Sequence, residues 1–250
     1  VTTSVSGNTS ETLTVLEATK KINTNVVAFS SNGRMENFCR TNNILHKIIP
    51  QYHSPRASFT AYLYGMLKIL KPILPIKEED IQESINELFK LRNKISSSNI
   101  SDENPSQELA KWIKGIPLIY YPWGLQASAI RFKNSLQENG KTHVIAEDVV
   151  EACHNGIVSW EKKSNVNPIL LQGKDDYPKT KERWGIIKEY FDSNGIEYKE
   201  IFSENGSIVT KLINLIYLLD YTSIYYAIIQ KIDPSPIPSI DFVKKRSTLV

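Results

Sequence analysis

Short apolar runs alternate with amphipathic stretches along most of the chain, and this pattern predicts strands that alternate with helices. The first part of the sequence contains five such elements before Pro72. They are a helix over residues 11–22, a strand over 25–30, a helix around 35–41, a strand over 45–49 and a helix from about residue 58. Strand–helix alternation of this kind is typical of a parallel sheet covered by helices.

A second alternation follows a predicted helix at residues 78–95 and a polar run at residues 96–106, which we interpret as a linker. Its expected elements are a strand at 116–121, a helix at 125–136, a strand at 168–172, a helix at 180–192, a strand at 197–202, a long helix at 208–231 and a short helix after Pro238. Asn194-Gly195 supplies a helix stop. The sequence therefore predicts two similar α/β units in tandem.

Composition and charge narrow the class of protein. The chain has 250 residues, of which 41% are apolar and 23% charged, as in ordinary globular proteins. Its net charge is only +3, without a long basic run, so we expect no nucleic-acid partner. Cys39 and Cys153 lack the spacing of a zinc site or a disulfide framework. Two reduced thiols favour a cytoplasmic protein.

One apolar stretch, residues 212–229, has the length of a membrane span. Asp220 lies near its middle, and a central aspartate costs about 2.5 to 3.5 kcal/mol on insertion. We therefore expect a buried helix and no membrane association. The chain begins at Val1 without Met and runs into what looks like the end of a strand, so we expect that part of the natural N-terminus is missing.

The hydroxyl-rich segment SVSGNTSET, residues 4–12, follows that first strand and opens a helix. Backbone N–H groups and hydroxyls would converge there at the positive end of the helix dipole, an arrangement that suits a phosphate dianion. Gly7 would let the backbone turn closely around the ligand. The segment is not a nucleotide P-loop, because it lacks Gly-Lys-Ser/Thr. An ordinary N-capped turn accounts for the same spacing.

Four blocks in one order carry a family resemblance: SVSGNTSETL, SPRAS at residues 54–58, FKNSLQENGK followed by EACHNG, and DPSPIPSIDFVKK near the end. Together they resemble the bifunctional phosphoglucose/phosphomannose isomerases of archaeal type. The resemblance implies two tandem sugar-isomerase (SIS) domains, each a mostly parallel sheet flanked by helices in a three-layer sandwich. The implied divisions are residues 1–76 for the first domain, 77–115 for connecting helices and linker, and 116–250 for the second.

The resemblance also implies the chemistry. The enzyme would interconvert glucose 6-phosphate, and mannose 6-phosphate, with fructose 6-phosphate through a cis-enediol, without a cofactor or a metal ion. It would act as a homodimer. The hydroxyl-rich segment would hold the substrate phosphate through Ser4, Ser6 and Thr9.

Three residues match the catalytic positions of the family. Glu138 corresponds to the base that moves the proton, and His154 to the residue that opens the sugar ring and reaches the partner subunit's site. Arg56 would steady the negative enediolate oxygens. Each has a plain structural alternative: a surface glutamate at a helix end, a packed or capping histidine, and a salt-bridged arginine. We read His46, His53 and His143 as structural or solvated.

Two departures from the family pattern stand out. The first glycine-serine loop of the family would lie before Val1, and Tyr225 stands where some members have a catalytic lysine. Two rival functions remain open at this stage. A non-catalytic regulator that binds sugar phosphates would use the same domains. An aminating isomerase similar to the isomerase half of glucosamine-6-phosphate synthase would need an ammonia source.

Overall fold

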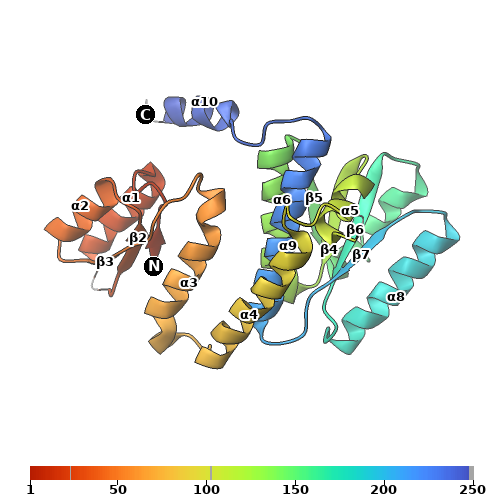
Figure 1. Cartoon of the computed structure of the whole chain (residues 1–250), viewed down its shortest axis with the longest axis horizontal. Helices are drawn as coiled ribbons and strands as arrows, with labels where there is room; N and C mark the ends of the chain where they lie inside the picture. Colours follow the sequence, from red (N-terminus) through yellow and green to blue (C-terminus); the bar gives the residue numbers. More distant parts are fainter. Residues whose placement is uncertain (23, 102, 248–250) are drawn as a thin grey trace. The chain divides into compact units, whose positions relative to one another are not determined.

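The computed structural model describes residues 1–22, 24–101 and 103–247. The chain divides into two compact units, an N-terminal unit of residues 1–77 and a C-terminal unit of residues 78–250 (Figure 1). The predicted linker at 96–106 includes residue 102, and the predicted second domain at 116–250 includes residues 248–250; these four residues lie outside the described ones.

The N-terminal unit contains one parallel sheet in the order β1-β2-β3. Its strands are β1 Thr2–Thr3, β2 Val27–Ser30 and β3 Leu45–Ile48. Its α-helices are α1 Ser10–Ala18, α2 Arg34–Thr41 and α3 Phe59–Leu70, and its short 3-10 helices are η1 Thr19–Lys21, η2 Arg56–Ser58 and η3 Lys71–Ile73.

Alternate residues of the central strand β2 fill the two faces of this sheet. Ala28 packs with Leu13 and Leu16 of α1 and with Met35 of α2. The next residue, Phe29, points to the opposite face and packs against the α3 side, because successive side chains of a strand alternate. The unit is therefore a small three-layer structure with all its strands pointing the same way.

The C-terminal unit holds a second parallel sheet in the order β5-β4-β6-β7. Its strands are β4 Ile116–Tyr121, β5 Ile145–Asp148, β6 Val166–Gln172 and β7 Lys199–Phe202. Its helices are α4 Glu78–Ile95, α5 Pro105–Trp112, η4 Trp123–Leu125, α6 Gln126–Gly140, α7 Val149–Ala152, η5 Gly156–Glu161, α8 Pro178–Ser193, α9 Ile208–Ile229 and α10 Pro238–Ser247.

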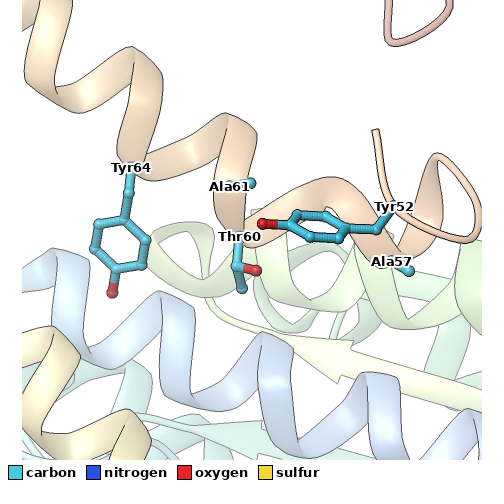
Figure 2. A pocket seen from close by; sticks show the side chains of 5 residues that line it. All are labelled: Tyr52, Ala57, Thr60, Ala61 and Tyr64. Carbon is cyan, nitrogen blue, oxygen red and sulfur yellow. The ribbon is translucent and has the colours of Figure 1, made fainter. Parts of the chain in front are cut away.

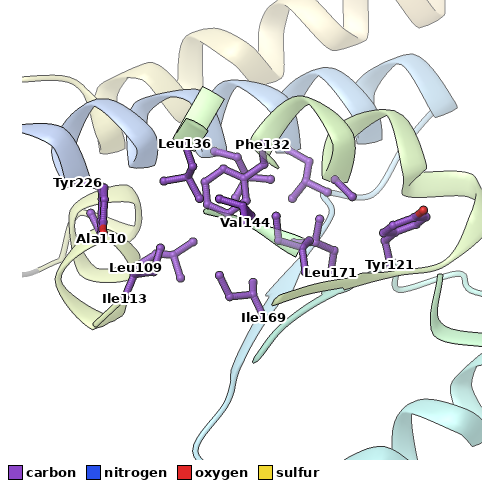
Figure 3. Close-up of a cluster of buried hydrophobic side chains, with 14 of the residues drawn as sticks. Leu109, Ala110, Ile113, Tyr121, Phe132, Leu136, Val144, Ile169, Leu171 and Tyr226 are labelled. Carbon is purple, nitrogen blue, oxygen red and sulfur yellow. The ribbon is translucent and has the colours of Figure 1, made fainter. Parts of the chain in front are cut away.

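The two central strands of this sheet, β4 and β6, divide the core into two layers. Ile119 and Leu171 pack against α5, α6 and α9 in the cluster that Figure 3 shows. Tyr120 and Leu170 face the other way and pack against α7 and α8. In Figure 1, α6 and α9 accordingly lie on one side of the sheet and α8 on the other. Parallel sheets flanked by helices on both faces confirm the predicted α/β class.

The predicted long apolar helix is α9. Within the described residues, α9 is the one helix that is long and apolar enough to cross a membrane. Half of its most apolar 18-residue stretch is buried inside the protein. A core helix has the same composition, and α9 packs against α4, α5 and α6. The charge of Asp220 is met by Arg131 on α6, so α9 lies within the protein as its central aspartate indicated.

Three elements differ from the sequence-based expectation. β5 and α7 lie in residues 137–167, where no element was predicted; β5 is an edge strand of four residues, IAED, with too few apolar positions to give a signal. α5 begins inside the predicted linker. Asn104 caps it by accepting from the N–H groups of Ser106 and Gln107, and Pro105 occupies its first turn. Asn-Pro is a recognisable helix start that the polarity of the run concealed.

Candidate functional site

The hydroxyl-rich segment forms a tight loop, residues 4–9, at the carboxyl end of β1. Gly7 adopts the left-handed conformation with φ 67° and donates its N–H to the carbonyl of Ser4 at 3.0 Å. A Cβ at position 7 would lie 1.7 Å from the carbonyl oxygen of Asn32. Glycine is therefore required twice, for the backbone angle and for the close approach of a second loop.

That second loop, residues 30–34, follows β2 and opens α2. The N–H of Met35 donates to the carbonyl of Gly7 at 2.9 Å, and the N–H of Arg34 donates to Oδ1 of Asn8 at 3.1 Å. The two loops are thus joined by backbone groups at the carboxyl edge of the sheet. Ligands of open α/β sheets bind at this edge.

The three predicted phosphate ligands differ in exposure. The Ser4 side chain is buried, and its hydroxyl lies 2.8 Å from that of Thr9. Ser6 and Thr9 are exposed. Within the described residues the Thr9 side chain makes no capping bond to α1, although Thr9 is the N-cap residue. The start of α1 is thus not closed by its own cap residue, which leaves its first turn open to an anion.

Arg56 lies at the same edge of the N-terminal sheet, because its segment follows β3. The Tyr62 hydroxyl of α3 is 3.3 Å from the carbonyls of both Val5 and Ile49, so it links the hydroxyl-rich loop to the start of the Arg56 segment. Burial raises the pKa of Tyr62, which keeps this hydroxyl protonated as a donor. The segment that contains Arg56 and the predicted phosphate loop thus both begin at this edge of the sheet.

An open hollow of about 460 Å³ lies in the N-terminal unit. Its lining residues come from the segment before α3 and from the first turns of α3: Tyr52, Ala57, Thr60, Ala61 and Tyr64. Figure 2 shows the Tyr52 ring next to Thr60, with Tyr64 one turn further along the helix. The volume falls within the range of small-molecule sites. Two aromatic rings and three hydroxyls, those of Tyr52, Tyr64 and Thr60, provide both apolar and hydrogen-bonding surface.

His46 on β3 contacts the second loop through the Ser30 hydroxyl. Its Nε2 lies 2.8 Å from the Ser30 hydroxyl, which in turn donates to the carbonyl of Asn32 at 2.9 Å. Burial lowers the pKa of His46 and keeps the ring neutral. The sequence analysis read His46 as structural or solvated, and its place in this chain of hydrogen bonds is structural. The Ser30 contact was missed, because nothing in the local sequence shows which strand β3 will pair with.

Glu138 lies half-buried in the last turn of α6, in the C-terminal unit. The next two residues fix this turn against α9. The Asn139 side chain donates to the Ser223 hydroxyl at 2.8 Å, and a Cβ at Gly140 would lie 2.7 Å from the ring of Tyr226. The backbone of Glu138 is therefore held in place while its side chain reaches the surface.

His154 is exposed and follows α7, where its N–H donates to the carbonyl of Glu151 at 2.9 Å. The pKa values of two nearby groups, the Glu147 carboxyl and the Cys153 thiol, are raised, which favours their uncharged forms. Burial, together with the charge of Glu151, raises the pKa of Glu147, and burial raises the pKa of the Cys153 thiol. In residues 1–22, 24–101 and 103–247, no cluster of three or more His, Cys, Asp or Glu side chains is placed to hold a metal ion.

Glu138 and His154 lie near opposite ends of the strands of the C-terminal sheet. α6 starts at the carboxyl end of β4 and returns along the sheet, so Glu138 in its last turn lies near the amino ends of the strands. His154 comes after β5, which is parallel to β4, and therefore lies at the carboxyl edge. The 15 residues of α6 span about 22 Å. The two side chains therefore do not meet within the C-terminal unit of one chain.

A polar cluster between α6 and α9 was missed by the sequence analysis. Arg131 binds the Asp220 carboxylate through Nε at 3.1 and 3.2 Å and through Nη2 at 2.8 Å, and the Ser135 hydroxyl donates to the same carboxylate at 2.6 Å. A signal was present, because an aspartate inside an apolar helix needs a partner. The partner itself depends on how the two helices pack.

Tyr225, at the position where some relatives of the resembled family have lysine, has a structural contact. Its hydroxyl donates to the carbonyl of Ile95 at 2.7 Å, at the end of α4. The Asn104 side chain also reaches this hydroxyl, at 3.4 Å. Tyr225 therefore joins α9 to the α4–α5 connection.

Residues 102–246 match the sequence model of a family described as the bacterial phospho-glucose isomerase C-terminal SIS domain. Two curated relatives are similar over nearly the whole chain. Both are named bifunctional phosphoglucose/phosphomannose isomerase. The protein of Caldicellulosiruptor bescii is 26% identical over 98% of this chain and 75% of its own length. The protein of Thermoplasma acidophilum is 26% identical with the same two coverages.

The fold also resembles a solved structure, a glucose-6-phosphate isomerase like protein from Thermus thermophilus. The TM-score is 0.63, the sequence identity is 15%, and the match covers 84% of this chain and 76% of that one. At this identity the likeness supports the α/β fold of the SIS class, with parallel sheets flanked by helices.

Proposed function

Because its residues 102–246 match the family model, this chain belongs to the bacterial phospho-glucose isomerase C-terminal SIS domain family, and we propose that it is an aldose–ketose isomerase. It interconverts glucose 6-phosphate, and mannose 6-phosphate, with fructose 6-phosphate. One observation carries the proposal: relatives named phosphoglucose/phosphomannose isomerase align over 98% of the chain. Glu138 and His154, which the enzyme reading needs, are both present.

Glu138 is the base that moves the proton between C1 and C2. It removes the proton alpha to the carbonyl, and the electron pair forms the C1–C2 double bond of the cis-enediolate. A proton passes from the hydroxyl oxygen to the former carbonyl oxygen, and the same carboxyl returns its proton to the neighbouring carbon. Its firmly held backbone and half-buried side chain support this role, because a base must stay within reach of both carbons. Arg56 stabilises the negative charge that develops on the enediolate oxygens.

His154 protonates the ring oxygen and opens the cyclic sugar before the proton shift. It acts in the site of the partner subunit of a homodimer. The separation of Glu138 and His154 along α6 supports this arrangement, since a single chain holds them at opposite edges of the sheet. The exposure of His154 leaves its imidazole available to a second chain.

Ser6, Thr9 and the start of α1 bind the phosphate, and Ser4 orients Thr9 through the hydroxyl contact of 2.8 Å. The loop is held in its final shape by the second loop, so binding requires little reorganisation. The chain contains two tandem SIS domains, residues 1–76 and 116–250, with residues 77–115 as the connecting helices and linker. The two parallel sheets, each with helices on both faces, support this tandem scheme.

The test is turnover of fructose 6-phosphate in a coupled assay, with wild type and Glu138→Gln. Glutamine keeps the shape and removes the basic oxygen, so kcat falls about 10² to 10⁴-fold while KM stays within a few-fold. Glu189→Gln, at an exposed position on α8, is the matched control and keeps full activity. Binding of sugar phosphate by a wild type that never turns over would instead support the regulator.

The same variant tests the assembly. Inactive Glu138→Gln and inactive His154→Asn chains are unfolded together, refolded and assayed. A mixed dimer contains one site with both native residues, so about a quarter of wild-type activity returns if His154 enters the partner's site. A mixture that stays as inactive as its two components contradicts the shared site.

A further inference from the structure

At the end of α6, one lysine side chain donates hydrogen bonds to three backbone carbonyls. The Nζ of Lys141 donates to the carbonyl of Glu138, to that of Pro236 at 2.8 Å and to that of Pro234 at 3.4 Å. An ammonium group has three N–H donors, which matches these three acceptors. One bond lies within the helical turn that carries Glu138, and the other two reach the segment between α9 and α10.

The backbone of Lys141 indicates that its side chain matters. The residue has φ 51° and ψ 34°, the left-handed conformation in which helices commonly end with glycine. A residue other than glycine costs about 1 kcal/mol there. Glycine would form the same turn without this cost, but it could not bind the carbonyls of Pro234 and Pro236.

The bonds of Lys141 complete the support of the Glu138 turn. On the inner side, Asn139 bonds Ser223 and Gly140 lies against the Tyr226 ring, so α9 holds the turn. Lys141 adds a tie to the chain segment that leaves α9, in which prolines limit the backbone freedom. The positive charge also lies at the helix end where the dipole is negative.

We infer that Lys141 is a positioning residue for Glu138: its ammonium fixes the last turn of α6 against the segment around Pro234–Pro236, and thereby sets where the Glu138 carboxylate stands. The inference rests on the proposed isomerase function, in which Glu138 must reach two adjacent carbons. Misplacement by about 1 Å can cost up to 10²-fold in rate. Substrate binding through the phosphate loop does not depend on this turn.

The experiment compares kcat and KM for fructose 6-phosphate in three variants. Lys141→Met keeps the length and the backbone strain but removes the ammonium, and Lys141→Gly relaxes the strain as well. We expect kcat to fall about tenfold in both, with KM within about twofold, because the proton transfer and not binding is affected. Lys141→Arg retains donors and charge, and we expect it to recover part of the loss.

Lys231→Met is the matched control. Lys231 is the other described lysine with a positive φ, 57°, and it starts the same segment. Lys231→Met keeps wild-type kcat if the loss of rate is due to the bonds of the Lys141 ammonium with the three carbonyls. The inference is overturned if kcat of both Lys141→Met and Lys141→Gly stays within twofold of wild type, if Lys231→Met loses as much, or if Lys141→Arg is no better than Lys141→Met. A wild type without turnover would instead refute the proposed function.

Discussion

The proposed phosphate loop of the N-terminal unit and the seam between helices α6 and α9 of the C-terminal unit are each stabilised in a different way. The loop at residues 4–9 is fixed mainly by backbone groups and by one glycine that lets a second loop approach. The seam is fixed by side chains, above all by Arg131 and Asp220. A phosphate loop needs its hydroxyls and N–H groups for the ligand, so its own stability must come from the backbone.

The seam has the opposite requirement. In the proposed mechanism Glu138 keeps one position while it moves a proton. The helix that bears it is tied to α9 by an ion pair, by the Asn139–Ser223 bond and by close packing at Gly140. The comparison teaches that the proposed binding loop and the helix of the proposed base are made rigid by different groups. It predicts that the loop is sensitive to added atoms and that the seam is sensitive to lost charges.

The largest effect is expected for Gly7→Ala. The added Cβ would lie 1.7 Å from the carbonyl oxygen of Asn32, so the two loops must separate. The alanine would also have to adopt φ 67°. We expect a loss of about 2 to 4 kcal/mol in the free energy of unfolding, measured by urea denaturation, and a raised KM for phosphorylated sugars. Gly195→Ala is the control, since it has φ 62° but nothing within 4 Å. Equal losses in the two variants would show that the close approach of the loops is unimportant.

A smaller effect is expected for Asp220→Ala. It leaves the Arg131 guanidinium, whose side chain is only 21% exposed, without its carboxylate. We expect a loss of about 1 to 3 kcal/mol in the free energy of unfolding, measured in the same way. Glu182→Ala removes an exposed partner of Lys179 on α8 and is expected to cost less than about 1 kcal/mol. A loss for Asp220→Ala no greater than this control would contradict a seam held by charge.

The smallest effect concerns Glu83 of α4, whose carboxylate accepts from the N–H of Ser207 at 2.9 Å and from the Thr210 hydroxyl at 2.7 Å, at the start of α9. The backbone bond from Ser207, followed by the side-chain bonds from Thr210 and Ser207, lowers the pKa of Glu83 below its usual value of 4.5. A lowered folded-state pKa means that this stabilisation is complete above the unfolded pKa. It is lost as the pH falls through the folded value.

Thermal melts of wild type and Glu83→Gln from pH 7 downward measure this effect. The wild type should melt a few degrees (about 2 to 4 °C) higher at pH 7. The difference should persist to about pH 4.5 and shrink below it, as the carboxylate becomes protonated. A difference that does not change with pH would mean that the charge of Glu83 plays no part in capping α9.

Much of the fold was predictable because its signals are local. The helix over 78–95 agrees with α4, and the stop at Asn194-Gly195 agrees with the end of α8 at Ser193 and with φ 62° at Gly195. Gly7 was expected to let the backbone turn closely around a ligand. The structure shows a left-handed turn at Gly7, and the group close to it is the carbonyl of Asn32. β5 was missed because four half-exposed residues at a sheet edge carry little pattern, and their strand exists only by pairing with β4.

By itself the sequence determined the alternation of strands and helices, the glycine turn near the start, and the presence of a carboxylate and an imidazole in recognisable blocks. All of these depend on a few neighbouring residues. Only the tertiary structure decided that Asp220 meets Arg131, that Lys141 gathers carbonyls from residues beyond α9, and that Glu138 and His154 lie at opposite ends of one sheet. These contacts join residues far apart in sequence, and their geometry follows from the packing of whole helices on a parallel sheet.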